Sequence, residues 1–256
     1  MKYDRIQEIR RLLIRNRKVS TADLCTRFSV SLETIRRDLN MLESEGMLRK
    51  VYGGAVLTDN SDPPQSMSAR ESRSVVCDHE KRRIAAKAID LIPDNAIIAL
   101  DSGTTLFRFA QLLNQRRGLT VLTNSMDIAV EVTRHTSHLV YYIGGVIKRT
   151  EMITTGFLAE DFLNRFSCID LAVFSADGVS LSNGISDHCV EMGIIKQKIL
   201  AKSERGICLV DHTKYGMDTF FKVGDLREFD TFVVDDGLPS ASRLEMKSAG
   251  VQVIIA

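Results

Sequence analysis

The sequence predicts an α/β protein of two domains, a small helical domain with a β-hairpin followed by a larger domain built on a mostly parallel sheet. Helical apolar spacing fills residues 1–57, and a polar stretch with two prolines follows. Apolar strand-like runs then alternate with amphipathic helical segments to the end of the chain. The length of 256 residues and the 44% apolar content are sufficient for two packed cores.

The first domain should contain three helices and a hairpin. The second helix begins at Ser20 with a sequence typical of a capping box and runs to Phe28, and residues 29–31 form the turn to the third. The third helix starts at Leu32 and ends at Gly46, and residues 48–56 form a hairpin around Gly53-Gly54. Apolar residues at helical spacing mark the inner faces of the first and third helices: Ile6, Ile9, Leu13, Leu32, Ile35, Leu39 and Leu42.

The boundary between the domains lies in residues 58–74. This segment contains Asp-Asn-Ser-Asp-Pro-Pro-Gln-Ser at residues 59–66 and has almost nothing to bury. We therefore expect a first domain at residues 1–57, a linker at 58–74 and a second domain at 75–256.

Seven apolar runs predict the strands of the second domain. Because helical segments separate them, the strands should form a Rossmann-like, largely parallel sheet covered by helices on both faces. The apolar residues Leu106, Phe107, Phe109, Leu112 and Leu113 should pack against this sheet as core. The predicted strands are residues 96–100, 120–122, 139–143, 171–174, 207–210, 231–234 and 251–255.

Charge is distributed unevenly along the chain. Residues 1–57 carry twelve Lys and Arg against seven Asp and Glu, whereas residues 58–256 carry twenty-two against twenty-six, so a net charge of +1 hides a basic first domain. A basic domain favours a polyanionic partner. The five cysteines form no Cys-x-x-Cys pair and are interpreted as reduced, mostly buried thiols. With neither a membrane-spanning run nor a signal peptide in the sequence, we expect a cytoplasmic protein without membrane contact.

The third helix and the hairpin offer groups that bind DNA. Polar side chains lie away from the buried face of the helix, and arginine forks among them can pair with guanine or bind phosphate. The sequence does not show which of Arg36 and Arg37 reaches a base. Together with the basic hairpin, this pattern is typical of a winged helix-turn-helix. The candidate DNA-binding residues are Ser31, Glu33, Thr34, Arg36, Arg37, Asn40, Arg49, Lys50, Tyr52 and Gly53.

The segment from Val30 to Leu39, Val-Ser-Leu-Glu-Thr-Ile-Arg-Arg-Asp-Leu, resembles the signature of DeoR-type bacterial repressors, and so do Leu42, Gly46, Arg49 and Gly53-Gly54-Ala55. The resemblance implies a transcriptional repressor that binds double-stranded operator DNA. Two-fold symmetry would double the contacts to a palindromic or repeated operator, so we expect a homodimer or a homotetramer.

Polar loops follow several predicted strands of the second domain. Residues 101–105, Asp-Ser-Gly-Thr-Thr, leave a strand and open a helix, where backbone amides and hydroxyls suit a phosphate. The loops at Thr123-Asn124-Ser125, Gly144-Gly145 and Ala176-Asp177-Gly178 also follow strands, where open α/β sheets bind ligands. Lys196, Asp211 and Lys214 could neutralise phosphate and bind hydroxyls. The candidate effector-binding residues are Asp101, Ser102, Gly103, Thr104, Thr105, Thr123, Asn124, Ser125, Gly145, Asp177, Gly178, Lys196, Asp211 and Lys214.

These loops together are similar to the effector domain of the DeoR-type regulators. The resemblance implies a fold related to ribose-5-phosphate isomerase and a small phosphorylated sugar as effector. It implies that residues 101–105 hold the phosphate or hydroxyl end and that the effector releases a repressor of carbohydrate uptake or breakdown genes from its operator. The chain departs from the family at Ser175, where the family often has Gly, and Glu191 aligns with the family's acidic position only to within a residue.

Three alternatives stay open. A phosphosugar isomerase or a related transferase-like enzyme would share the fold and use Asp101, Asp177, Glu191 and Lys196 in acid-base chemistry. A winged helix can also bind protein, although this leaves the basic charge unexplained. His135, His138 and His188-Cys189 lack further metal ligands at suitable spacing. We expect a regulator with no catalytic residues, no cofactor and no metal site.

Overall fold

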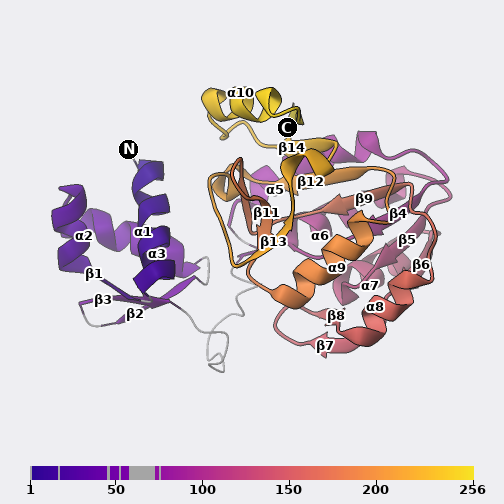
Figure 1. The fold of residues 1–256 in the computed structure, drawn as a ribbon, viewed down its shortest axis with the longest axis horizontal. Coiled ribbons are helices and arrows are strands. Elements are labelled where there is room, and N and C mark those ends of the chain that lie inside the picture. The colour runs from indigo at the N-terminus through magenta and orange to yellow at the C-terminus, as the bar shows by residue number, and fades with distance from the viewer. Residues whose placement is uncertain (1, 17, 45–46, 52, 58–72, 75) are drawn as a thin grey trace. The chain divides into compact units, whose positions relative to one another are not determined.

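The computed structural model in Figure 1 describes residues 2–16, 18–44, 47–51, 53–57, 73–74 and 76–256. The chain forms two compact units, residues 1–76 and 77–256. Most of the expected linker, residues 58–72, lies outside the described residues.

The first unit contains three helices and a three-stranded antiparallel sheet. The helices are α1 (Lys2–Asn16), α2 (Thr21–Phe28) and α3 (Leu32–Ser44). The strands are β1 (Lys18–Ser20), β2 (Leu48–Val51) and β3 (Gly54–Leu57), in the order β1-β3-β2. The winged helix-turn-helix is thus confirmed, with one strand, β1, that the sequence does not predict because three residues carry no alternating pattern.

Short polar residues fix the helix ends of this unit. The Ser20 hydroxyl accepts a hydrogen bond from the Asp23 amide at 3.4 Å and caps α2. Ser29 closes α2 in the left-handed conformation, with φ 50°. Gly54 is required where the wing meets β1, because a Cβ there would collide with the Val19 carbonyl oxygen.

The core of the first unit is formed mainly by the predicted apolar face. The prediction is wrong for Leu32, which is 43% exposed because it opens the first turn of α3, where the helix has not yet packed on its neighbours. The buried Asp38 accepts hydrogen bonds from Arg5, with Nε–Oδ2 at 2.6 Å, and ties α3 to α1. The buried apolar residues are Ile6, Ile9, Leu13, Leu24, Ile35, Leu39, Leu42, Leu48 and Ala55.

The second unit is built on a parallel sheet of seven strands in the order β15-β14-β12-β9-β4-β5-β6. All seven predicted strands are present. They are β4 (Ile97–Leu100), β5 (Thr120–Thr123), β6 (Leu139–Tyr142), β9 (Leu171–Phe174), β12 (Gly206–Val210), β14 (Thr231–Val234) and β15 (Gln252–Ile255).

Helices cover both faces of this sheet and make two apolar cores (Figure 1). Buried side chains of α5 (Asp78–Ala88), α6 (Thr104–Ala110) and α7 (Met126–His135) form one core. Those of α8 (Phe157–Asn164), α9 (Val190–Leu200) and α10 (Ser240–Ser248) join the other. Leu106, Phe109 and Leu113 are buried as predicted, and Phe107 and Leu112 are half-buried against them. Short 3-10 helices occur at Ile89–Leu91, Leu113–Gln115, His212–Lys214 and Leu226–Glu228.

Two small antiparallel sheets were not predicted from the sequence. One is the hairpin of β7 (Val146–Lys148) and β8 (Ile153–Thr155). The other has the order β10-β11-β13, with β10 (Gly178–Ser180), β11 (Gly184–Asp187) and β13 (Phe221–Gly224). Their strands are only three or four residues long, and β8, β10 and β11 are buried throughout, so no alternation marks them.

The strand order creates a switch point between β4 and β9. The chain runs outward from β4 to β5 and β6, and then returns to β9 and continues to β12, β14 and β15 on the other side. In open α/β sheets, ligands bind beyond the carboxyl ends of the strands at such a point. Here those ends carry Asp101 and Ser175.

The cysteines differ in part from the expectation. All five are free thiols, but only Cys208 is buried, Cys168 is exposed, and the other three are intermediate. In the part of the chain that the structure describes, no helix is long and apolar enough to cross a membrane.

Candidate functional site: a recognition helix and an effector pocket

The outer side of α3 presents the predicted DNA-binding groups to solvent. Glu33, Arg36, Arg37 and Asn40 are exposed. Arg37 Nε lies 3.3 Å from Glu33 Oε1 in a surface pair, whereas Arg36 makes no ion pair within the described residues. A surface pair of this kind contributes at most about 1 kcal/mol, so the Arg37 guanidinium can exchange Glu33 for DNA at little cost.

Two of the predicted DNA-binding residues also have a local structural role. The Ser31 hydroxyl accepts a hydrogen bond from the Thr34 amide at 3.3 Å, and the two hydroxyl oxygens are 2.9 Å apart. Ser31 therefore caps α3 and fixes the start of the helix.

The wing lies beside the same helix. Lys50 Nζ donates to Asn40 Oδ1 at 2.7 Å and pairs with Glu43 Oε2 at 2.8 Å. Arg49 is exposed, and Gly53 turns the hairpin with φ 80°. Tyr52, also predicted to bind DNA, lies outside the described residues. The structure thus gathers basic groups of α3 and β2 on one surface.

At the carboxyl edge of the large sheet, the central group is Lys196 of α9. Its Nζ donates to the Ser175 carbonyl oxygen at 2.6 Å and pairs with Asp101 Oδ2 at 3.0 Å and Asp187 Oδ2 at 2.7 Å. The contacts to the two carboxylates are ion pairs, and within the described residues the buried Asp187 Oδ2 makes no hydrogen bond. Lys196 thus joins the residues at the ends of β4, β9 and β11, and its contact with an effector phosphate stays a prediction.

Sequence reasoning missed Asp187. It ends β11, a strand of four buried residues, and its side chain is 1% exposed. The Asp177 amide donates to Asp187 Oδ1 at 3.4 Å, which links it to the predicted loop 176–178. The run Gly-Ile-Ser-Asp carries no sequence signal that separates a buried acid from an acid in a surface turn.

The electrostatics follow from this crowding of carboxylates. Burial raises the pKa of Asp187 to about 6, because the Lys196 ammonium compensates only in part and the charges of Asp177 and Asp101 add to the rise. Burial also raises the pKa of Asp101 against the opposing effect of Lys196. Burial by itself would lower the pKa of Lys196, but Asp101 and Asp187 outweigh it and raise that pKa, which keeps the amine charged.

The loop after β5 carries buried polar atoms that have no partner. Asn124 Oδ1 and Ser125 Oγ make no hydrogen bond within the described residues, and both side chains are 1% exposed. Because Thr123 is paired with Leu100, these residues follow β5 directly beside the loop that starts at Asp101. Buried polar groups without partners are uncommon and indicate a place for a ligand or water.

Glycines bring the loops of this edge close together. Gly103 has φ 129°, and a Cβ there would lie 2.6 Å from the Ser175 hydroxyl oxygen. At Gly145, with φ 151°, a Cβ would lie 2.6 Å from the Thr155 carbonyl oxygen. Gly178 is buried where a Cβ would approach the Met217 carbonyl oxygen to 2.5 Å. Gly103 and Gly145 thus allow loop approach, and Gly178 serves packing.

The remaining predicted residues lie around this centre. Ser102 and Thr105 are buried and Thr104 is half-buried at the start of α6. Asp211, at the end of β12, accepts a hydrogen bond from the Thr213 amide at 3.0 Å and caps the 3-10 helix that contains Lys214. Lys214 is half-buried and makes no ion pair within the part of the chain described. Glu191 pairs with Lys148 of β7 at 3.6 Å rather than with Lys196.

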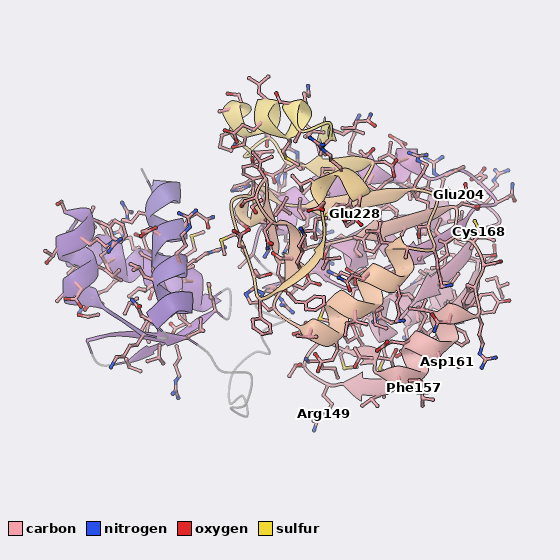
Figure 2. The ribbon with its side chains drawn as sticks, viewed as in Figure 1. Arg149, Phe157, Asp161, Cys168, Glu204 and Glu228 are labelled. Carbon is pink, nitrogen blue, oxygen red and sulfur yellow. The ribbon has the colours of Figure 1, made fainter. Side chains whose placement is uncertain are left out.

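The opposite edge of the sheet has a cavity of about 680 Å³. Figure 2 labels Glu228 and Glu204 of its lining. Its polar groups serve the fold: Asp230 accepts from the Gly206 amide at 2.7 Å, and Glu228 accepts from the Asp225 amide at 2.6 Å. The cavity therefore shows no buried polar group that awaits a ligand.

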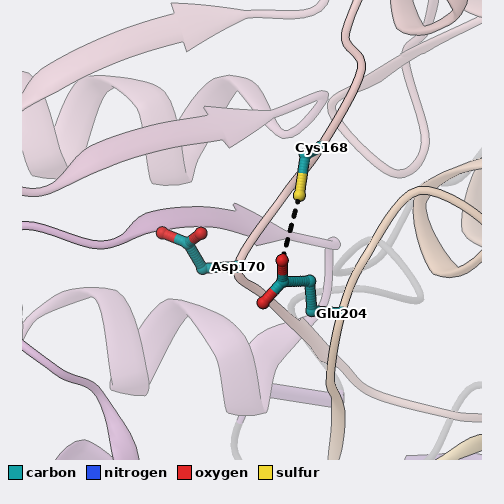
Figure 3. A group of neighbouring side chains, drawn as sticks. All are labelled: Cys168, Asp170 and Glu204. Carbon is teal, nitrogen blue, oxygen red and sulfur yellow. Dashed lines mark hydrogen bonds between the residues drawn. The ribbon is translucent and has the colours of Figure 1, made fainter.

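Three potential metal ligands, Cys168, Asp170 and Glu204, lie near one another at that edge (Figure 3), with ligand atoms within 4.8 Å. The Cys168 thiol donates to Glu204 at 3.5 Å, and Asp170 accepts from the Ile97 amide at 2.7 Å. His188 Nδ1 lies 3.1 Å from Asp177 Oδ2.

Comparison with known proteins agrees with both halves of this architecture. The family model of the DeoR-like helix-turn-helix domain matches residues 5–61, and that of the DeoR C terminal sensor domain matches residues 77–236. Among solved structures, a ribose-5-phosphate isomerase in complex with phospho-erythronic acid is similar at 19% identity over 54% of each chain. Its TM-score of 0.42 is too low to support an argument.

Curated relatives match along most of their length. The HTH-type transcriptional regulator IolR of Bacillus subtilis is 32% identical, over 86% of this chain and 85% of IolR. The L-fucose operon activator of Haemophilus influenzae is 32% identical over 87% of each. The HTH-type transcriptional repressor GlcR of Bacillus subtilis is 29% identical, over 98% of this chain and 95% of GlcR. These relatives are regulators and not enzymes, and with two family models across its length this chain belongs to the DeoR family of DNA-binding transcriptional regulators.

Proposed function

We propose that this protein is a cytoplasmic repressor of carbohydrate uptake or breakdown genes that leaves its operator when a small phosphorylated sugar binds the second unit. The observation that carries the proposal is the pair of buried, unpartnered atoms Asn124 Oδ1 and Ser125 Oγ beside the switch point of the sheet. Relatives named for an L-fucose operon and as the repressor GlcR support the link to sugar genes.

The DNA contacts follow from exposure and charge. Arg36 and Asn40 are one helical turn apart on the outer side of α3, so they can enter one groove together. Arg36 has no ion pair to break within the described residues, so we assign it the base contact. Arg49 and Lys50 on the wing bind phosphate, which positions α3 without reading sequence.

The effector contacts follow from the loops at the carboxyl edge. Backbone amides and hydroxyls of residues 101–105 suit the phosphate, and the free atoms of Asn124 and Ser125 suit sugar hydroxyls. Lys196 is 2% exposed and pairs with Asp101 and Asp187, so we assign it the role of positioning these two carboxylates at the site. Around these effector contacts lie the other predicted residues, Gly145, Asp177, Asp211 and Lys214.

Burial of the site couples effector binding to a change of conformation. Asp101, Ser102, Asn124 and Ser125 are each less than 5% exposed, so an effector reaches them only when the loops at the edge move apart. An effector that binds the opened arrangement more tightly shifts the population towards it, and that differential affinity is what weakens DNA binding. A homodimer or homotetramer would carry two or more recognition helices to a symmetric operator.

Operator binding by the full-length protein tests this function. The DNA upstream of its own gene is titrated at fixed salt, with and without a panel of sugar phosphates, against the unphosphorylated sugars. We expect specific binding that one sugar phosphate releases. Absence of specific binding together with conversion of a sugar phosphate would overturn the proposal in favour of an enzyme.

A matched pair of variants tests the site. Ser125→Ala removes a buried hydroxyl that has no partner in the described protein, so it should leave stability and operator affinity intact while weakening release by the effector. Ser137→Ala, at an exposed serine between α7 and β6, is the control. Wild-type release by the Ser125→Ala protein would remove this loop from the site.

A further inference from the structure

The two faces of the large sheet bring different groups to its carboxyl edge. Alternate residues of a strand point to opposite faces, so Ala99 of β4 packs in the core of α8 and α9, whereas Leu100 packs in the core of α5, α6 and α7. Lys196 of α9 reaches Asp101 from the first of these faces. Residues 101–105 open α6, which covers the second face. A phosphate at the start of α6 therefore lies on the side opposite to α9.

Lys81 of α5 is a buried cation on that second face. It is 4% exposed and lies on the inner side of α5 together with Ile84 and Ala85. These two neighbours belong to the same core as the buried residues of α6. Because taking an ammonium out of water is costly, its burial at this place indicates a role for its charge.

The first turn of α5 lies at the carboxyl edge, beside the first turns of α6. The helix α5 leads through the 3-10 helix Ile89–Leu91 into β4, so it runs opposite to β4 and begins where that strand ends. Its first residue, Asp78, accepts from Arg108 of α6, with Oδ1 and Nε 2.7 Å apart. Lys81 is in the same first turn of α5, so it enters the edge beside the loop that opens α6.

The end of β12 gives a second reference point for Lys81. Leu209 packs in the core of α5, and Asp211, two residues further along, points to the same face. The Lys81 amide donates to the carbonyl oxygen of Cys77, at the start of α5. Burial raises the pKa of the Cys77 thiol to about 12; the charges of Asp211 and Glu80 add to the rise, and the charge of Lys81 opposes it. One thiol thus lies near both Lys81 and Asp211.

Other lysines at this edge are less suited to the phosphate. Lys196 is paired with two buried carboxylates, and Lys148 pairs with Glu191 at 3.6 Å, at the start of α9. Lys214, in the 3-10 helix after β12, is half-buried and is the competing cation. Burial favours Lys81, because an ammonium attracts an anion more strongly where water is excluded.

We propose that Lys81 binds the phosphate group of the effector at the start of α6. The inference rests on the proposed function and adds the cation that neutralises the phosphate. Backbone amides of residues 101–105 donate hydrogen bonds to the phosphate oxygens, and the Lys81 ammonium supplies the opposite charge from α5. The phosphate and the sugar hydroxyls are thus bound by different elements, the hydroxyls by Asn124 and Ser125 after β5.

Binding of inorganic phosphate to the full-length protein tests this assignment. Isothermal titration calorimetry at constant ionic strength compares the wild type with Lys81→Met, which keeps an unbranched side chain and removes the charge. We expect the dissociation constant for phosphate to rise at least tenfold. Lys87→Met, at an exposed lysine of the same helix, is the control and should bind phosphate like the wild type. Lys81→Gln is the second variant if circular dichroism shows that methionine disturbs the fold.

Two results of the titration would overturn the proposal. One is the absence of phosphate binding by the wild type. The other is the same dissociation constant for Lys81→Met and Lys87→Met.

Release from the operator by the panel of sugar phosphates separates this inference from the proposed function. A compound that releases the wild type should be needed at a concentration at least ten times higher for Lys81→Met. Release of Lys81→Met at the wild-type concentration would reject the role of Lys81 alone. If no compound released the wild type, the proposed function would fail, and the inference with it. Loss of release in Lys214→Met but not in Lys81→Met would assign the phosphate to Lys214.

Discussion

The outer side of α3 and the Lys196 cluster (Lys196, Asp101 and Asp187) place the same kinds of residue in opposite surroundings. On α3 the charged groups lie in water, and Arg37 is 77% exposed beside Glu33. At the carboxyl edge of the sheet, Lys196 is 2% exposed between two carboxylates that are as deeply buried. Each region contains a basic group beside acidic ones, yet only one of them can exchange partners freely.

The difference in exposure determines how readily the charged groups of each region can change partners. An exposed pair contributes little to stability, so its arginine is available to DNA at little cost. A buried ammonium between two carboxylates is costly to unpair, so it holds together the loops that it joins. The contacts of the first region can be replaced at little cost, whereas those of the second are costly to break.

Removal of Lys196 should have the largest effect. Lys196→Met leaves Asp101 and Asp187 buried without their counter-charge, which should lower the free energy of unfolding of the second unit by about 3–5 kcal/mol. The measurement is urea unfolding of the full-length protein at neutral pH, followed by circular dichroism.

Lys198→Met on the same helix is the control for that change. Lys198 lies 3.6 Å from Glu160 in a pair that is about one-third exposed, so its loss should cost about 1 kcal/mol or less. Similar losses for the two variants would contradict the contrast between buried and exposed pairs.

The pH dependence of Asp187 should sharpen the comparison. Its pKa rises from 3.8 to about 6 in the folded protein, so between these values the folded state holds a proton that the unfolded chain has lost. Protonation of Asp187 therefore stabilises the folded state fully below about pH 3.8, and this stabilisation is lost as pH rises through about 6. Across this range the free energy of unfolding should fall by an amount on the order of 3 kcal/mol. Asp187→Asn removes this titration.

Unfolding of wild type and Asp187→Asn by urea, at pH values below and above this range, measures the effect. The free energy of unfolding of the wild type minus that of Asp187→Asn should be greatest at the lower pH and should decline as pH rises. A difference that stays constant with pH would show that Asp187 does not titrate there.

On the exposed side, Arg36→Ala should weaken operator binding by about 1–3 kcal/mol and relax the choice of base at one position. Titration of operators substituted at single positions measures this. Arg11→Ala, at an exposed arginine of α1, should leave the base preference unchanged. If Arg36→Ala keeps full affinity and selectivity while Arg37→Ala loses them, the base contact belongs to Arg37.

The sequence predicts the recognition surface well because its signals are local. Ile35, Leu39 and Leu42 fix the buried side of α3, and this alone decides that Arg36 and Asn40 face outward. The error at Leu32 arises at the first turn, where spacing cannot show how much of the neighbouring structure covers it. The strands of the large sheet are predicted equally well, because each is a continuous apolar run.

The Lys196 cluster was predicted only in part because its contacts join distant segments. The sequence placed the loops at residues 101–105, 123–125 and 176–178 correctly after their strands. It could not show that Lys196 reaches Asp101, ninety-five positions earlier in the chain, or that Asp187 completes the cluster. Asp187 lies in a short strand of a small sheet, where neither periodicity nor composition separates a buried acid from a surface turn.

The smallest effect on DNA binding should come from a substitution in the wing. This substitution distinguishes an arginine that binds phosphate from one that contacts a base. Arg49 lies on β2, and we assign it to phosphate, so Arg49→Ala should weaken binding to all sequences about equally and reduce the salt slope by about 1. The measurement is affinity against salt concentration for operator and for unrelated DNA. Loss of selectivity for the operator without a change in the salt slope would mean that Arg49 contacts a base. The base contacts would then come from the wing as well as from Arg36.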